Sequence, residues 1–160
     1  YGDHRDLHLS IRRQRQMCIR DSYKDNNAQR SYLYDGVREG LDYLKSQGYQ
    51  LGCVTNKLEQ FTHPLLKVLG IFNDFKIIIS GDTLAKRKPD PMPLLYCAEH
   101  FNLKPEDCLM LGDSVSDVKA ARAAGFDIIC MSYGYNHGND ISVENPDLVI
   151  DSMNQLSDHL

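Results

Sequence analysis

The sequence predicts an α/β fold with a mostly parallel sheet, and three observations support this. The 160-residue chain is 42% hydrophobic and 25% charged, which is ordinary for a globular domain. From Tyr34 onward, segments with helical spacing of apolar residues alternate with short apolar runs. These runs are continuous, as in strands covered on both faces. We therefore expect a three-layer, Rossmann-like core whose strands are joined by right-handed crossovers.

The expected helices show apolar residues three or four positions apart, close to a start or stop signal. Leu41 and Leu44 have this spacing ahead of Gly48, which is placed to end the first helix. Pro91 is placed for the first turn of a later helix. The expected helices cover 37–47, 58–69, 91–102, 116–124 and 153–160.

The expected strands are short and apolar, and each lies between two of these helices or near the end of the chain. The run 76–80 holds three consecutive isoleucines, whose branched side chains favour strands. The expected strands cover 50–55, 76–80, 108–111, 127–131 and 148–150. In parallel sheets, ligands bind where the carboxyl ends of the strands meet their loops.

Composition excludes several classes of protein. The net charge of −4 argues against nucleic-acid binding, which requires a basic face. No run approaches the ~18 apolar residues of a membrane helix. The five cysteines are odd in number and form no Cys-x-x-Cys pair, which favours a reducing compartment. We expect a cytoplasmic protein without a membrane partner, and the residues do not indicate its oligomeric state.

Polar residues follow the first two expected strands. The Thr55 hydroxyl and the Asn56 amide can donate to an anion, or either can cap the next helix. Lys88 lies in a basic run directly before Pro89-Asp90-Pro91, whose stiff backbone would hold its ammonium in place for a phosphate. The alternative is a solvated basic loop.

Asp113, Ser114 and Asp117 follow the third expected strand. Asp113 and Asp117 are four residues apart, so both carboxylates can face one point. Such oxygen ligands suit Mg²⁺, which also takes water and phosphate. The alternative is that Asp113 caps the next helix and Asp117 offsets its dipole. Because two adjacent carboxylates repel without a cation, we favour a metal site.

These three sites, in this order, resemble motifs two to four of the haloacid dehalogenase superfamily, from about Tyr34 to Leu160. Finer features resemble its phosphoglycolate phosphatases. They are found at 54–57, 81–82, 87–91, 112–114, 120–125 and 133–138. The resemblance implies Mg²⁺-dependent hydrolysis of a small phosphorylated metabolite, 2-phosphoglycolate, to glycolate and phosphate through an aspartyl-phosphate.

The resemblance also implies individual roles. Thr55, Asn56 and Ser114 would hold phosphate, with Ser114 alternatively contacting metal-bound water. Lys88 would offset charge on the phosphoryl group, so Lys88 and Thr55 are the expected catalytic residues. Asp113 would bind Mg²⁺ directly, and Asp117 would support the metal site through water or Lys88. His137 is expected to be structural or to lie at the rim.

One family motif has no counterpart in the sequence. The family's first strand ends in Asp-x-Asp-Gly-Thr, which supplies the nucleophile and the general acid/base, and no Asp-x-Asp occurs here. Because that strand lies between the strands carrying motifs two and four, we expect marginal stability and no turnover. The alternatives are a pyrophosphatase, a sugar-phosphate phosphatase or mutase, or a non-catalytic fragment that binds phosphate or a partner.

The charge distribution suggests a boundary near the beginning of the chain. Residues 1–30 carry a net charge of +3, whereas residues 31–160 carry −7. Residues 1–22 show no regular apolar period, and we expect a foreign or disordered leader there; the alternative is a genuine basic arm or a divergent amphipathic helix. Residues 23–33 would be a remnant of the family's helical cap, most of which is missing, and 34–160 would form the core domain.

Overall fold

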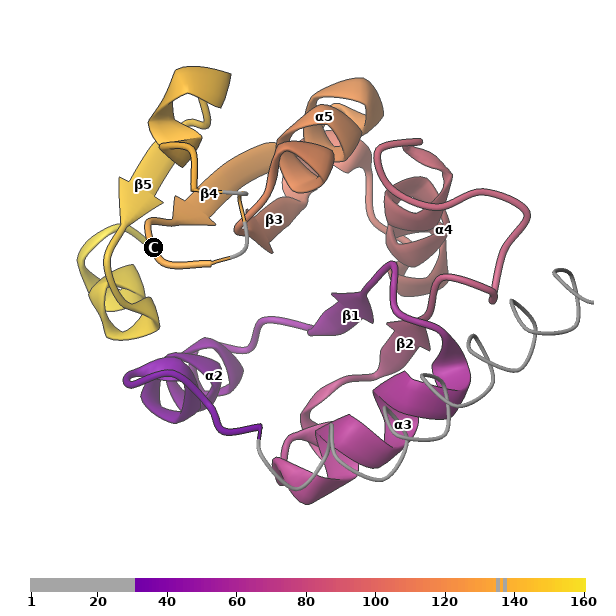
Figure 1. The fold of residues 1–160 in the computed structure, drawn as a ribbon, viewed down its shortest axis with the longest axis horizontal. Coiled ribbons are helices and arrows are strands. Elements are labelled where there is room, and N and C mark those ends of the chain that lie inside the picture. Colours follow the sequence, from indigo (N-terminus) through magenta and orange to yellow (C-terminus); the bar gives the residue numbers. More distant parts are fainter. Residues whose placement is uncertain (1–30, 135, 137) are drawn as a thin grey trace, which may run out of the picture.

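The computed structural model describes residues 31–134, 136 and 138–160, and these residues form helices and short parallel strands (Figure 1). The helices are α2 (Val37–Ser46), α3 (Glu59–Val68), α4 (Met92–Phe101) and α5 (Val115–Ala124). The strands are β1 (Gly52–Val54), β2 (Ile77–Ile79), β3 (Leu109–Gly112), β4 (Asp127–Met131) and β5 (Leu148–Ile150). The expected leader at 1–22, most of the expected cap remnant at 23–33, and His137 lie outside the described residues.

The strands form two sheets, one ordered β1-β2 and the other β3-β4-β5. All three pairings are parallel, as predicted. Cys53 lies opposite Ile78 in the first sheet, and Met110 lies opposite Ile128 in the second. Among the described residues, no strand pairs with the edge of β1 that faces away from β2 or with the edge of β3 that faces away from β4.

Helices cover the strands on both faces, which confirms the three-layer prediction. Strand β4 alternates its side chains between two cores. Ile128 and Cys130 pack with α4 and α5 on one face. Ile129 and Met131 pack on the other face, with Leu44 of α2. A third core joins α2 and α3 beside the β1-β2 sheet.

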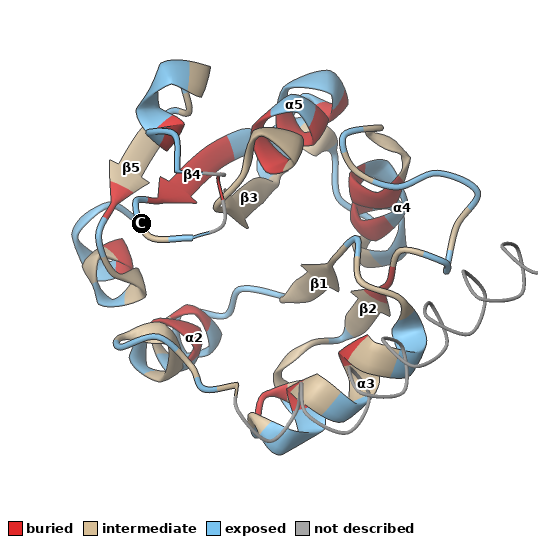
Figure 2. Cartoon of the chain, in the orientation of Figure 1, coloured by how far each residue is buried: buried red, intermediate tan, exposed pale blue. Residues whose placement is uncertain are grey.

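Burial differs sharply between the strands (Figure 2). In β4 every residue after Asp127 is buried, whereas all residues of β1 and β3 are half-buried. The apolar strands next to the two unpaired edges are therefore less covered than the centre of the three-stranded sheet. Helix α2 contributes Leu41 to the core beside the β1-β2 sheet and Leu44 to a core of the β3-β4-β5 sheet. It therefore links the two sheets on one face.

Some elements differ from the expectation. The predicted helix at 153–160 is a 3₁₀ segment, η4 (Met153–Asp158), because so short a segment gains little from an α-helical hydrogen-bond ladder. Three further 3₁₀ segments lie in loops: η1 (Phe72–Asp74), η2 (Pro105–Asp107) and η3 (Ile141–Glu144). Within the described part of the chain, no helix is long and apolar enough to cross a membrane.

Candidate active site

The carboxyl end of β1 positions Thr55. Its N–H donates to the Ile79 carbonyl at 2.9 Å, so the ladder with β2 continues one residue beyond β1. The Lys57 N–H donates to Thr55 Oγ1 at 3.1 Å, which tightens the turn that follows. No described residue accepts from the Thr55 hydroxyl, so its hydrogen can be donated to a ligand. Thr55 does not cap α3.

Asn56 ties the end of β1 to the Lys88 segment. Its Nδ2 donates to the Lys88 carbonyl at 2.8 Å, although the two residues are 32 positions apart. This contact uses one of the two amide hydrogens, and the other remains for a ligand. Like Thr55, Asn56 does not cap α3.

The Lys88 side chain contacts both β1 of the first sheet and α5, which follows β3 of the second sheet. Its Nζ donates to the Val54 carbonyl at 2.7 Å and lies 2.7 Å from Asp117 Oδ1. The Lys88 side chain is 10% exposed and that of Asp117 is 6% exposed, so this ion pair is buried. The alternative of a solvated basic loop therefore does not hold for Lys88. Lys86, which is 60% exposed and pairs with Asp90, does behave as a solvated residue.

The start of α5 organises the acidic residues. Ser114 is the N-cap, and it forms a capping box with Asp117. Asp117 Oδ2 accepts from the Asp113 N–H and the Ser114 N–H at 3.1 Å each, and from Ser114 Oγ at 2.7 Å. The helix cap is thus Ser114, and not Asp113 as in the alternative considered from the sequence.

Asp117 stays ionised despite its burial. Desolvation acts to raise the pKa of its carboxyl, but Lys88, Ser114 and the Asp113 N–H together lower that pKa below its ordinary value. Both carboxylate oxygens of Asp117 have protein partners, through Lys88 on one side and the capping box on the other. This geometry suits a residue that holds its neighbours in position.

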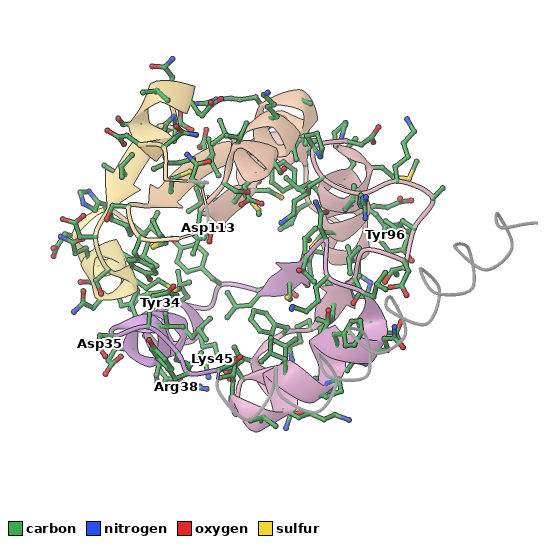
Figure 3. All side chains as sticks on the ribbon, in the orientation of Figure 1. Tyr34, Asp35, Arg38, Lys45, Tyr96 and Asp113 are labelled. Atoms are coloured by element: carbon green, nitrogen blue, oxygen red, sulfur yellow. The ribbon has the colours of Figure 1, made fainter. Side chains whose placement is uncertain are left out.

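Asp113 packs against the loop after β4. A Cβ added to Gly134, whose φ is +147°, would lie 2.5 Å from Asp113 Cβ, so a side chain there would displace the aspartate. Figure 3 shows Asp113 toward the middle of the molecule, well apart from Tyr96 on α4. Asp113 thus lies just beyond β3, beside the Lys88–Asp117 pair that extends from β1.

The oxygen donors near Asp113 fit a cation that is coordinated mainly by water and substrate and by few protein side chains. Among residues 31–134, 136 and 138–160, no cluster of three or more His, Cys, Asp or Glu side chains could hold a metal. Mg²⁺ is commonly bound by one or two carboxylates, with water and phosphate completing its shell. A cation with several protein ligands, such as structural zinc, does not fit these residues.

Five of the six predicted site residues are linked by direct contacts. Asn56 holds the Lys88 backbone, Lys88 contacts Asp117, and Asp117 accepts from Asp113 and Ser114. Thr55 follows Val54, whose carbonyl Lys88 contacts. Asp82 lies in segment 81–82, which resembles the family, but no role was predicted for it; its Oδ1 accepts from the N–H of Glu59, the first residue of α3, at 2.9 Å. A partner 23 residues away leaves no local signal.

Comparisons with known proteins point in one direction. A family profile described as haloacid dehalogenase-like hydrolase matches residues 5–131. This match begins inside segment 1–22, and the foreign origin of that segment stays a prediction. A phosphoglycolate phosphatase of Nitrosococcus oceani is 62% identical over 138 residues, which are 86% of this chain and 61% of that protein. One from Pseudomonas putida is 42% identical over 154 residues, 96% of this chain and 56% of that protein.

Solved structures agree with the sequence comparisons. The crystal structure of a "predicted phosphoglycolate phosphatase" from Haemophilus somnus has a TM-score of 0.82 at 37% identity, covering 85% of this chain and 60% of that one. A HAD phosphatase from Thermococcus onnurineus has a TM-score of 0.68 at 28% identity, covering 79% and 57%. The chain thus spans between half and two thirds of the length of these relatives.

Proposed function

The chain belongs to the haloacid dehalogenase-like hydrolases, and from that premise we propose that it carries the phosphate- and magnesium-binding part of a phosphatase for 2-phosphoglycolate. The main support is the contact of Lys88 with the end of β1 and with Asp117 at the start of α5. The relatives named phosphoglycolate phosphatases support the choice of substrate. The complete reaction would convert 2-phosphoglycolate and water to glycolate and phosphate.

The chain's own residues would bind and orient the phosphoryl group. Thr55 would donate its hydroxyl hydrogen, and Asn56 its second amide hydrogen, to phosphate oxygens. Ser114 would contribute a further polar contact, and Lys88 would offset negative charge that builds up during transfer. Lys88 Nζ is already within hydrogen-bonding distance of Val54 and Asp117, so no large reorganisation is needed.

Asp113 would hold Mg²⁺, and Asp117 would support it by fixing Lys88 and the Asp113 backbone. The cation supplies charge neutralisation for the phosphoryl oxygens when it is bound. The pairing of both Asp117 oxygens with protein groups supports an indirect role for this residue. Asp113 is then the carboxylate that contacts the metal.

We further propose that this chain does not turn over substrate, because its sequence holds no Asp-x-Asp motif to supply a nucleophile. Its ligand would be a small phosphorylated metabolite, without a nucleic-acid or membrane partner, in the cytoplasm. Another phosphatase or mutase of the same superfamily remains the second candidate, because the residues linked here bind the group that all such substrates share.

Isothermal titration of the 160-residue protein with inorganic phosphate in the presence of Mg²⁺ tests the binding proposal. We expect measurable binding that Thr55→Val weakens about tenfold, the effect of losing one hydrogen bond to a charged group. Thr55→Ser should retain it. Equal binding by all three proteins would contradict the role of Thr55. Release of phosphate from 2-phosphoglycolate with Mg²⁺ would contradict the proposed lack of turnover.

A further inference from the structure

Two tyrosines stack beside the candidate metal site. The ring centroids of Tyr34 and Tyr133 are 4.4 Å apart, with an angle of 36° between the ring planes. Tyr133 is the second residue after β4 and packs against the core that contains Met131 and Ile150. Tyr34 is 54% exposed, so it contributes little to any core. The Tyr34 ring also has an edge-on contact with the exposed Tyr32, at 6.4 Å between centroids, but the ring contact with Tyr133 is the one that joins it to the loop after β4.

The inner end of this stack reaches Asp113. Tyr133 is followed by Gly134, where an added Cβ would lie 2.5 Å from Asp113 Cβ and 2.6 Å from its Oδ2. Burial, together with the nearby Tyr34 and Asp113, raises the pKa of the Tyr133 hydroxyl. Because Gly134 is the next residue in the chain, a displacement of Tyr133 would move the backbone that packs on the Asp113 carboxylate.

The outer end of the stack is anchored to a different element. Ser152 Oγ donates to the Asp35 carbonyl at 3.1 Å, and the Ser152 N–H donates to Gln155 Oε1 at 3.1 Å in the cap of η4. Gly36 has a φ of +82°, and a Cβ there would overlap Ser152 Oγ. Tyr34 thus precedes a segment that is fixed by hydrogen bonds and by close packing.

We propose that Tyr34 is a positioning residue for Asp113. Anchored through Asp35 and Gly36, it would press its ring on Tyr133 and hold the following backbone against the Asp113 side chain. The expected consequence for Mg²⁺ rests on the proposed function. The contact between Tyr34 and Tyr133 is made by their rings. We therefore assign the positioning role to the ring of Tyr34 and not to its hydroxyl. Figure 3 shows Tyr34 at the start of α2, far from Tyr96.

The test compares Tyr34→Ala and Tyr34→Leu with the conservative variant Tyr34→Phe. Tyr96→Ala is the matched control, because Tyr96 is 46% exposed but lies on α4. Amide resonances of Asp113 and Gly134 are recorded without metal, and Mg²⁺ affinity is measured by titration. We expect Ala and Leu at position 34 to shift both resonances and to weaken Mg²⁺ binding about tenfold, at the low end for outer-shell partners. Tyr34→Phe and Tyr96→Ala should change neither.

The proposal is overturned if Tyr34→Leu leaves the Asp113 and Gly134 resonances in place, or if Tyr96→Ala shifts them equally. A folded wild-type chain that binds no Mg²⁺ would instead count against the proposed metal site. The metal-free resonances would still decide whether Tyr34 positions Asp113. The two failures are therefore distinguishable.

Discussion

The two sheets contribute differently built halves of the candidate site. The acidic half begins at the end of β3, where Asp113, Ser114 and Asp117 lie within five residues and are organised by one capping box. The other half combines Thr55 and Asn56 with Lys88, more than 30 residues away, through the 2.8 Å contact from Asn56 to the Lys88 carbonyl. The acidic half is thus a local structure. The half formed by Thr55, Asn56 and Lys88, which we call the phosphate half, depends on tertiary contacts.

The sheets beneath these halves differ in the same direction. Each half follows a half-buried strand, β3 for the acidic half and β1 for the other half. The neighbours of these strands differ: β3 pairs with β4, where every residue after Asp127 is buried, whereas β1 pairs with β2, where only Ile79 is buried. Lys88 joins the half on the less buried sheet to the half on the more buried sheet, through its contacts with Val54 and Asp117. Substitutions at Lys88 and Asp117 change this contact, whereas substitutions in the cores change only packing. Comparing their effects on stability tests how far the phosphate half depends on the acidic half.

The largest expected effect comes from breaking the Lys88–Asp117 pair. Lys88→Met should destabilise the protein by about 3–5 kcal/mol, because it leaves a buried carboxylate without its cation. The variant that also carries Asp117→Asn should recover part of this loss. Urea unfolding of the single variants and the double variant measures the coupling between them. Additive effects would mean that the pair does not join the two halves.

Core packing provides the next comparison. Ile128→Ala in β4 should cost about 3–4 kcal/mol, because Ile128 is fully buried and the change leaves a cavity. Ile78→Ala in β2 removes the same atoms from a half-buried position, so we expect about 1–2 kcal/mol. Thermal and urea unfolding of both variants give the two values. Equal losses would contradict the difference in burial between the sheets.

Acid should produce a smaller change that also reports on the pair. The pKa of Asp117 is lowered in the folded protein, so its stabilising contribution is present above the unfolded pKa of about 4 and is lost as pH falls through the lower folded value. Urea unfolding between pH 7 and pH 3 should show this loss in the wild type. The Lys88→Met, Asp117→Asn double variant should lose less stability over the same range. Parallel curves would contradict this assignment.

The sequence was sufficient for the order of elements and for the residues at the strand ends, because both depend on local patterns. Apolar runs marked each of the five strands that the structure describes, and the spacing of Asp113 and Asp117 correctly placed them around the start of one helix. The separation into two sheets follows from pairing across the chain. Asp82 at the start of α3 and Tyr34 on Tyr133 are likewise contacts between distant segments, which periodicity does not encode.

The position of Lys88 also has a thermodynamic consequence. One ammonium group contacts the end of β1 and the carboxylate that organises the backbone of Asp113. A phosphate that draws on the charge of Lys88 would change the field at Asp117 and, through it, the affinity of Asp113 for a cation. By linkage, the cation would change phosphate affinity by the same factor. The two ligands are then expected to bind as a coupled pair, with a cooperativity that vanishes when Lys88 is replaced.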